Sequence, residues 1–153
     1  MAARKPVKVF EGIEGPCFLK LELKKGEEIV ARNFYCVAEK DNVYDWPASN
    51  WFISPIKEYG DLSFVTALPQ AKLSMEVNKA EEGFSVTLTN NSEVIAYQNI
   101  LKALDEKGQL IPAVLWSDNF FALVPRESRT VLCTLPEGVQ VAEWGFSGWN
   151  GVL

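Results

Sequence analysis

The chain has 153 residues, of which 48% are hydrophobic and 23% are charged, and its formal net charge is −5. These values are typical of one ordinary globular domain with a core of its own. The acidic balance argues against a nucleic-acid partner, which requires a basic patch, and against a polybasic membrane surface. No apolar run reaches the roughly 20 residues of a membrane span. We therefore expect neither a nucleic-acid nor a membrane partner.

The absence of histidine from the sequence removes the commonest general base and the commonest metal ligand. It also excludes every Ser-His-Asp and Cys-His catalytic arrangement. Cys17, Cys36 and Cys133 lie in separate strand-like runs with no CxxC pair among them. We interpret them as small core residues, with a disulfide between two strands as the alternative. The sequence predicts no cofactor and no metal.

The N-terminal segment MAARKPVKVF lacks the apolar stretch of a signal peptide. We therefore expect no signal peptide here, and either a cytoplasmic protein or a piece cut from a longer polypeptide.

Apolar residues recur with period two along most of the chain, which predicts half-buried β-strands. In FLKLEL, residues 18–23, the three leucines fall on one side, and the phenylalanine, lysine and glutamate fall on the other. In FSVTLTN, residues 84–90, the apolar residues face away from the hydroxyl residues. Turn-forming glycines separate the runs. The expected strands, some of them fragments, are 6–12, 17–24, 28–37, 62–66, 71–79, 83–90, 94–104, 110–115, 119–124, 128–134 and 139–147.

This regular spacing of short strands and turns predicts an all-β fold, a sandwich of two antiparallel sheets. The segment at 94–108 also permits a helix, but the turns on both sides favour a strand. No linker or repeat interrupts the chain, so we expect a single domain, 1–153.

An aromatic-rich, proline-broken excursion at about 41–68 interrupts the strand pattern. Aromatic rings in such a segment stack on sugars, anchor contacts between domains, or pack locally. The sequence leaves these three interpretations open.

The stretch Trp116-Ser117-Asp118-Asn119 has the residue types of a catalytic motif. Its Ser-Asp-Asn occurs in β-lactamase-type enzymes, but only together with S-x-x-K and K-T-G, and both are absent. We favour a structural turn before a buried strand, with an interface or ligand contact as the alternative. No spacing of the acidic residues requires the paired carboxylates of a glycosidase. Asn90-Asn91-Ser92 matches the glycosylation triplet, which we interpret as a chance match in a turn.

Several motifs follow one another in an order that resembles a known family. They are Asn33-Phe34-Tyr35, Asp45-Trp46 through Trp51-Phe52, Tyr59-Gly60-Asp61-Leu62-Ser63, Leu88-Thr89-Asn90, Trp116-Ser117-Asp118-Asn119, Val124-Pro125-Arg126-Glu127-Ser128 and Ser147-Gly148-Trp149-Asn150. Together they resemble the C-terminal immunoglobulin-like domain of glycoside hydrolase family two, in its exo-β-D-glucosaminidase and β-mannosidase-like branch. The resemblance covers about residues 18–150. Arg126 departs from it where the family usually has glycine, and Cys36 departs from it where an aromatic is common.

The resemblance implies a non-catalytic accessory immunoglobulin-like domain of a multidomain glycosidase. In that family the catalytic glutamates lie in a separate (β/α)₈ barrel, which needs about 250 residues. The implied partners are neighbouring domains of a periplasmic or secreted parent. The alternative is an independent carbohydrate-binding module for chitosan- or mannan-type sugars. We predict no catalytic residue in this chain. The residues expected to contact a neighbouring domain or a sugar are Trp46, Trp51, Tyr59, Trp116, Asp118, Asn119 and Trp149.

Overall fold

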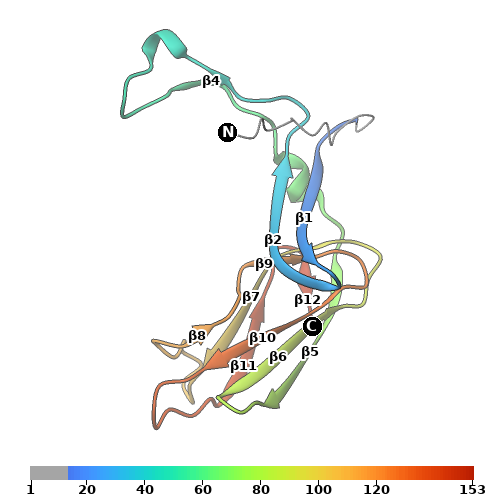
Figure 1. Ribbon diagram of the computed structural model, residues 1–153, viewed down its shortest axis with the longest axis vertical. Coiled ribbons are helices and arrows are strands. Elements are labelled where there is room, and N and C mark those ends of the chain that lie inside the picture. Colours follow the sequence, from blue (N-terminus) through green and yellow to red (C-terminus); the bar gives the residue numbers. More distant parts are fainter. Residues whose placement is uncertain (1–13) are drawn as a thin grey trace. The chain divides into compact units, whose positions relative to one another are not determined.

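The computed structural model describes residues 14–153 of the chain (Figure 1). Contacts between residues divide the chain into two compact units, Met1–Ala67 and Leu68–Leu153. The strand expected at 6–12 lies outside the described residues. The expectation that residues 1–153 form one domain stays a prediction. No helix among the described residues is long and apolar enough to cross a membrane.

The second unit is an all-β sandwich, as the sequence predicts. Its larger sheet has the strand order β12-β5-β6-β10-β8, and its smaller sheet has the order β11-β7-β9. Every pairing is antiparallel except that of β12 with β5, which is parallel and lies at the sheet edge. The strands are β5 (Ala71–Lys79), β6 (Phe84–Asn90), β7 (Ala96–Leu104), β8 (Leu115–Trp116), β9 (Phe121–Leu123), β10 (Ser128–Thr134), β11 (Glu143–Ser147) and β12 (Gly151–Val152).

The core of this unit lies between the two sheets and follows the period-two pattern of the sequence. Val86 and Leu88 of β6 are fully buried beside Val131 of β10, and they pack with Leu101 of the smaller sheet. On the outer face of the larger sheet, hydroxyl side chains pair across strands, as Thr87 does with Thr130 at 2.8 Å. Burying each large aliphatic side chain contributes about 1.5–3 kcal/mol.

Two strand predictions in this unit have clear outcomes. The segment that also permitted a helix forms β7, which confirms the strand. The strand predicted at 110–115 was wrong over most of its length, because only an isolated bridge at Leu110 and the two residues of β8 pair there. Pro112 has no N–H to donate, and Ala113 has a φ of +57°, which a strand does not accept.

The first unit consists of two hairpins and short 3₁₀ turns. β1 (Cys17–Lys25) pairs antiparallel with β2 (Glu28–Val37), and β3 (Val43–Tyr44) pairs with β4 (Ile56–Glu58). The 3₁₀ turns η1 and η2 span Trp46–Ala48 and Ser63–Ala67. The strand predicted at 62–66 was therefore wrong. The Asp61 carboxylate accepts the Ser63 N–H at 2.8 Å, and the Thr66 hydroxyl donates to the Ser63 carbonyl, so local side-chain bonds favour a helical turn.

Arg126 occupies a tight turn in the left-handed region of backbone conformation. Its φ is +63°, and the Glu127 N–H donates to the Val124 carbonyl at 3.1 Å to close the turn. The tight turn is therefore kept although arginine stands where the resembling family has glycine. Its side chain donates to Glu93 at 2.8 Å on the exposed surface. A non-glycine residue in this conformation costs about 1–2 kcal/mol.

We predict that Arg126→Gly is more stable than Arg126→Ala by about 1 kcal/mol, because only glycine relieves the strained φ. Both substitutions remove the exposed pair with Glu93, so their difference isolates the backbone effect. Urea unfolding of the two variants measures this difference. Equal stabilities would show that the turn stores no strain.

All three cysteines are free thiols, so the disulfide alternative was wrong. Cys133 is fully buried on β10, which confirms its interpretation as a core residue, whereas Cys17 and Cys36 are half-buried. Burial raises the pKa of the Cys133 thiol to about 11. Burial, with a smaller contribution from Cys17, also raises the pKa of Cys36.

The raised pKa of Cys133 makes the free energy of unfolding fall at high pH. Below the ordinary thiol pKa of 9.0, the thiol is protonated in both states. Between pH 9.0 and about 11 the unfolded thiol ionises while the folded thiol stays protonated, so rising pH favours unfolding. Urea unfolding at about pH 8 and about pH 10 should show a larger loss in the wild type than in Cys133→Ala. The same loss in both would contradict this assignment.

Candidate functional site

The excursion at about 41–68 contains a loop whose shape is fixed by hydrogen bonds and an ion pair among its own residues. At its base, the Asp45 N–H donates to the Pro55 carbonyl at 2.8 Å, and the Asp45 carboxylate pairs with Lys57 at 3.4 Å. Further out, the Asn50 side-chain oxygen accepts the N–H groups of Phe52 and Ile53 at 2.9 and 3.1 Å. The loop between β3 and β4 is therefore built around specific turns.

The excursion carries large aromatic side chains on its outside. Trp46 is 68% exposed, Trp51 is 86% exposed and Tyr59 is 77% exposed. Phe52 is exposed beside Trp51, with the ring centroids 3.5 Å apart. Phe52 was missed among the predicted site residues, although its place in an apolar run inside a proline-broken loop was the available signal. Clustered exposed apolar side chains mark interaction surfaces.

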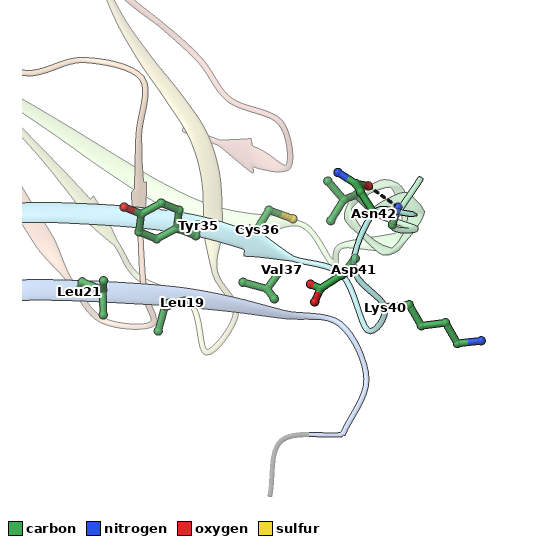
Figure 2. A pocket seen from close by; sticks show the side chains of 11 residues that line it. Leu19, Leu21, Tyr35, Cys36, Val37, Lys40, Asp41 and Asn42 are labelled. Carbon is green, nitrogen blue, oxygen red and sulfur yellow. Dashed lines mark hydrogen bonds between the residues drawn. The ribbon is translucent and has the colours of Figure 1, made fainter. Parts of the chain in front are cut away.

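A hollow of about 520 Å³ lies at the base of the excursion. Figure 2 shows Leu19 and Leu21 of β1 beside Tyr35 and Val37 of β2, all of which line it. Its far wall includes Asn42, whose side-chain oxygen accepts the Gly60 N–H at 2.7 Å.

A side chain at position 60 would collide with the chain on the other side of this wall. A Cβ on Gly60 would lie 2.7 Å from the Lys40 carbonyl oxygen and 2.9 Å from the Ala38 side chain. The glycine of the Tyr59-Gly60-Asp61 motif is therefore explained by this close approach of two backbone segments.

Trp116 and its neighbour Ser117 make contacts within the sandwich. Trp116 pairs with Cys133 across β8 and β10, and its ring packs edge-on against Trp144 with centroids 6.0 Å apart. The Ser117 hydroxyl accepts the Leu132 N–H at 2.9 Å. Both residues of the predicted motif extend the edge of the larger sheet.

Asp118 belongs to a cluster of charges around Arg129. The Arg129 guanidinium lies 3.0 Å from Asp118 and 3.6 Å from Glu127, and it stacks 4.8 Å above the Phe121 ring. The Arg129 side chain is mostly buried, so these carboxylates neutralise a charge at the rim of the core. Asp118 and Glu127 thus converge on one cation, so its charge is paired within the sandwich.

The Asn119 side chain makes the hydrogen bonds that the backbone of a neighbouring strand would otherwise make. Its side-chain oxygen accepts the Leu101 N–H at 2.9 Å, and its side-chain NH₂ donates to the Leu101 carbonyl at 3.1 Å. One amide side chain therefore pairs both polar groups of a strand residue. The following residue, Phe120, is exposed and has a φ of +59°.

Trp149 is 55% exposed, and its ring packs edge-on against Tyr97 with centroids 6.5 Å apart. Asn150, next to it, bonds two other segments of the chain at once. Its NH₂ donates to the carbonyls of Pro69 and Ile95, both at 2.7 Å, and its oxygen accepts the Tyr97 N–H at 2.9 Å. The Ser147-Gly148-Trp149-Asn150 motif therefore fastens the C-terminal strand to the sandwich.

Asn90, the acceptor of the glycosylation triplet, is fully buried. Its NH₂ donates to the Val94 carbonyl at 2.8 Å, and its oxygen accepts the Ser92 N–H at 3.0 Å. The nitrogen that a glycan would occupy is used inside the fold, which agrees with the chance-match interpretation. Among residues 14–153, no three acidic or thiol side chains gather closely enough to hold a metal ion.

The seven predicted contact residues thus fall into two sets. Trp46, Trp51 and Tyr59 are exposed on the excursion in the first unit, and Trp149 is exposed in the second. The second set consists of residues whose side chains bond or pack within the sandwich, namely Trp116, Asp118 and Asn119. Whether any of the seven touches a domain or a sugar stays a prediction.

The two-sheet arrangement of the second unit is that of an immunoglobulin-like β-sandwich. Residues 51–151 match the family described as the exo-beta-D-glucosaminidase Ig-fold domain. The chain belongs to this family, which confirms the resemblance drawn from the motifs. The β-mannosidase side of that resemblance stays a prediction.

Relatives and solved structures agree with this assignment. Exo-beta-D-glucosaminidases from Arthroderma benhamiae and Hypocrea jecorina are 32% and 31% identical over 87% and 86% of the chain. The crystal structure of Amycolatopsis orientalis exo-chitosanase CsxA matches 95% of the chain and 18% of its own, with a TM-score of 0.77 at 24% identity. The chain spans about 15% of the length of the curated relatives. A (β/α)₈ barrel needs about 250 residues and is not contained in this chain.

Asn119→Ala should lower the free energy of unfolding by about 2 kcal/mol, because two backbone groups of Leu101 lose their partners. Asp118→Ala is the matched control, with an expected loss of about 1 kcal/mol or less. Asp118 is partly exposed, and Glu127 still faces Arg129. Urea unfolding measures both variants. A loss at Asn119 no larger than that at Asp118 would contradict the structural role.

Proposed function

We propose that this chain is a non-catalytic accessory part of a longer exo-β-D-glucosaminidase-like glycoside hydrolase. The family and the 15% share of the relatives' length support this proposal. The catalytic residues of the hydrolase would lie in a barrel elsewhere in the polypeptide. The whole hydrolase would be exported to the periplasm or the medium. The role of this chain is to pack against the barrel or another neighbouring domain.

The observation that carries the packing role is the exposure of the excursion aromatics. Trp51 is 86% exposed and rests on Phe52, which is exposed as well. Large rings bury much apolar area at a small entropic cost, so they anchor interfaces well. An excursion whose backbone is fixed by Asp45 and Asn50 presents these rings without further ordering.

Oxidative footprinting of the tryptophans tests this contact. In the 153-residue chain Trp51 should oxidise readily, and in the longest protein that its gene encodes it should be protected several-fold. Trp144, which is half-buried within the sandwich, is the internal reference and should react equally in both. Equal oxidation of Trp51 in the two proteins would remove the packing role.

The alternative function is an independent carbohydrate-binding module. Titrating the chain with chitosan or mannan oligosaccharides, while following its amide NMR signals, distinguishes this function from the packing role. We expect no shifts at millimolar sugar. Saturable shifts around Trp46 and Trp51 would favour the binding module. Hydrolysis of aryl glycosides by the 153-residue chain alone would contradict a non-catalytic role.

A further inference from the structure

One face of the β1–β2 hairpin is uncharged and mostly apolar. The register pairs Leu19 with Tyr35, Leu21 with Asn33 and Leu23 with Ala31, so these side chains share a face. We call this surface the leucine face, and it consists of Cys17, Leu19, Leu21, Leu23, Ala31, Asn33, Tyr35 and Val37.

Solvent reaches much of the leucine face. Leu21 is 42% exposed, Leu23 is 63% exposed and Tyr35 is 46% exposed. At one end of the face, Leu19, Leu21 and Tyr35 line the hollow described above (Figure 2). Placing apolar area in water costs about 25 cal/mol per Å², so this arrangement favours a covering layer.

Along the hairpin, Lys20, Glu22 and Arg32 lie on the opposite face, and the charged pair of Lys25 and Glu28 lies next to the turn. On the opposite face, Glu22 pairs with Lys20 at 2.9 Å and with Arg32 at 3.5 Å. Phe18 stacks on Phe34 and on Phe64, with ring centroids 5.4 and 5.2 Å apart. The opposite face therefore combines charged and aromatic residues, whereas the leucine face has no charged residue. A strand pattern of this kind is typical of a sheet with an apolar layer against its uncharged face.

We propose that the leucine face packs against the apolar face of a second β-sheet, contributed by the part of the longer polypeptide outside these 153 residues. This inference rests on the proposed function. An isolated two-stranded hairpin is at best marginally stable in water, and sheet-on-sheet packing supplies the missing layer about 10 Å away. The relatives have most of their length outside the region that this chain matches, so they contain polypeptide enough for such a sheet.

A covalently linked layer fits this surface better than a separate molecule does. The leucine face has eight residues, whereas a stable interface between two proteins takes about 20–30 residues on each side. A second copy of the chain would therefore bind weakly through this face alone. A layer within the same polypeptide is held at high effective concentration and needs no such area.

Photo-crosslinking tests the proposal in the longest protein that the gene encodes. Benzoylphenylalanine replaces Leu21 in one variant, Leu23 in a second, and Glu27 in a control. Glu27 lies exposed in the turn of the same hairpin. After irradiation, mass spectrometry should find the Leu21 and Leu23 probes joined to one peptide segment outside this chain, and the Glu27 probe joined to none. If the variant with the probe at Leu21 fails to fold, the variant with the probe at Leu23 provides the test.

Three outcomes would overturn the proposal: a crosslinked dimer through the same face, a crosslink only within these 153 residues, or none at all. A second measurement uses Leu23→Lys, which should lower the melting temperature of the longer protein by several degrees and leave the 153-residue chain unchanged. Glu27→Lys adds the same charge in the turn and should change neither. If Trp51 is protected but Leu21 forms no crosslink, only this inference is contradicted. If the gene encodes no barrel, the proposed function itself is contradicted.

Discussion

The sandwich depends on asparagine side chains that form hydrogen bonds with backbone N–H and C=O groups where the strands stop pairing. A backbone N–H or C=O left buried without a partner costs about 1–3 kcal/mol, and short strands leave many such groups at their ends. Asn119 bonds both polar groups of Leu101, and Asn90 and Asn150 each join separate segments of the unit. An amide is suited to this because it donates and accepts at once. The core between the sheets can close because these ends are satisfied.

The two units differ in where they place their apolar residues. In the second unit, Val86, Leu88 and Val131 are sealed between sheets. In the first unit, the leucine face and the excursion aromatics are exposed to water. Large apolar side chains of the second unit, such as Leu115 and Phe120, are exposed as well, but among the described residues only the first unit lacks any fully buried side chain. Because exposed apolar area is costly, a unit without a sealed core gains most from a covering partner. The two proposals therefore concern the first unit, and the second supplies the stable body of the family fold.

The sequence was informative where burial follows the local period. The alternation in 71–79, 84–90 and 128–134 predicts strands that the structure contains almost residue for residue. It failed at 62–66, where apolar residues look like a strand but Asp61 and Thr66 bond the nearby backbone and form a 3₁₀ turn. The candidate site needs the structure for another reason. Only the folded chain shows that Asp118 contacts Arg129 and that the Asn119 side chain bonds the Leu101 backbone, because these partners lie far apart in the sequence.

By itself, the sequence determined the all-β class, the family and the absence of histidine chemistry, because periodicity, motif order and composition are local properties of the chain. The tertiary structure decided which aromatics are exposed to water, which motif residues are bonded within the fold, and that Leu21 and Leu23 of β1 are exposed. Exposure and hydrogen bonding depend on partners far apart in the sequence, such as Asn150 and Pro69. Until the chain folds, no local pattern specifies which of its apolar faces will be covered.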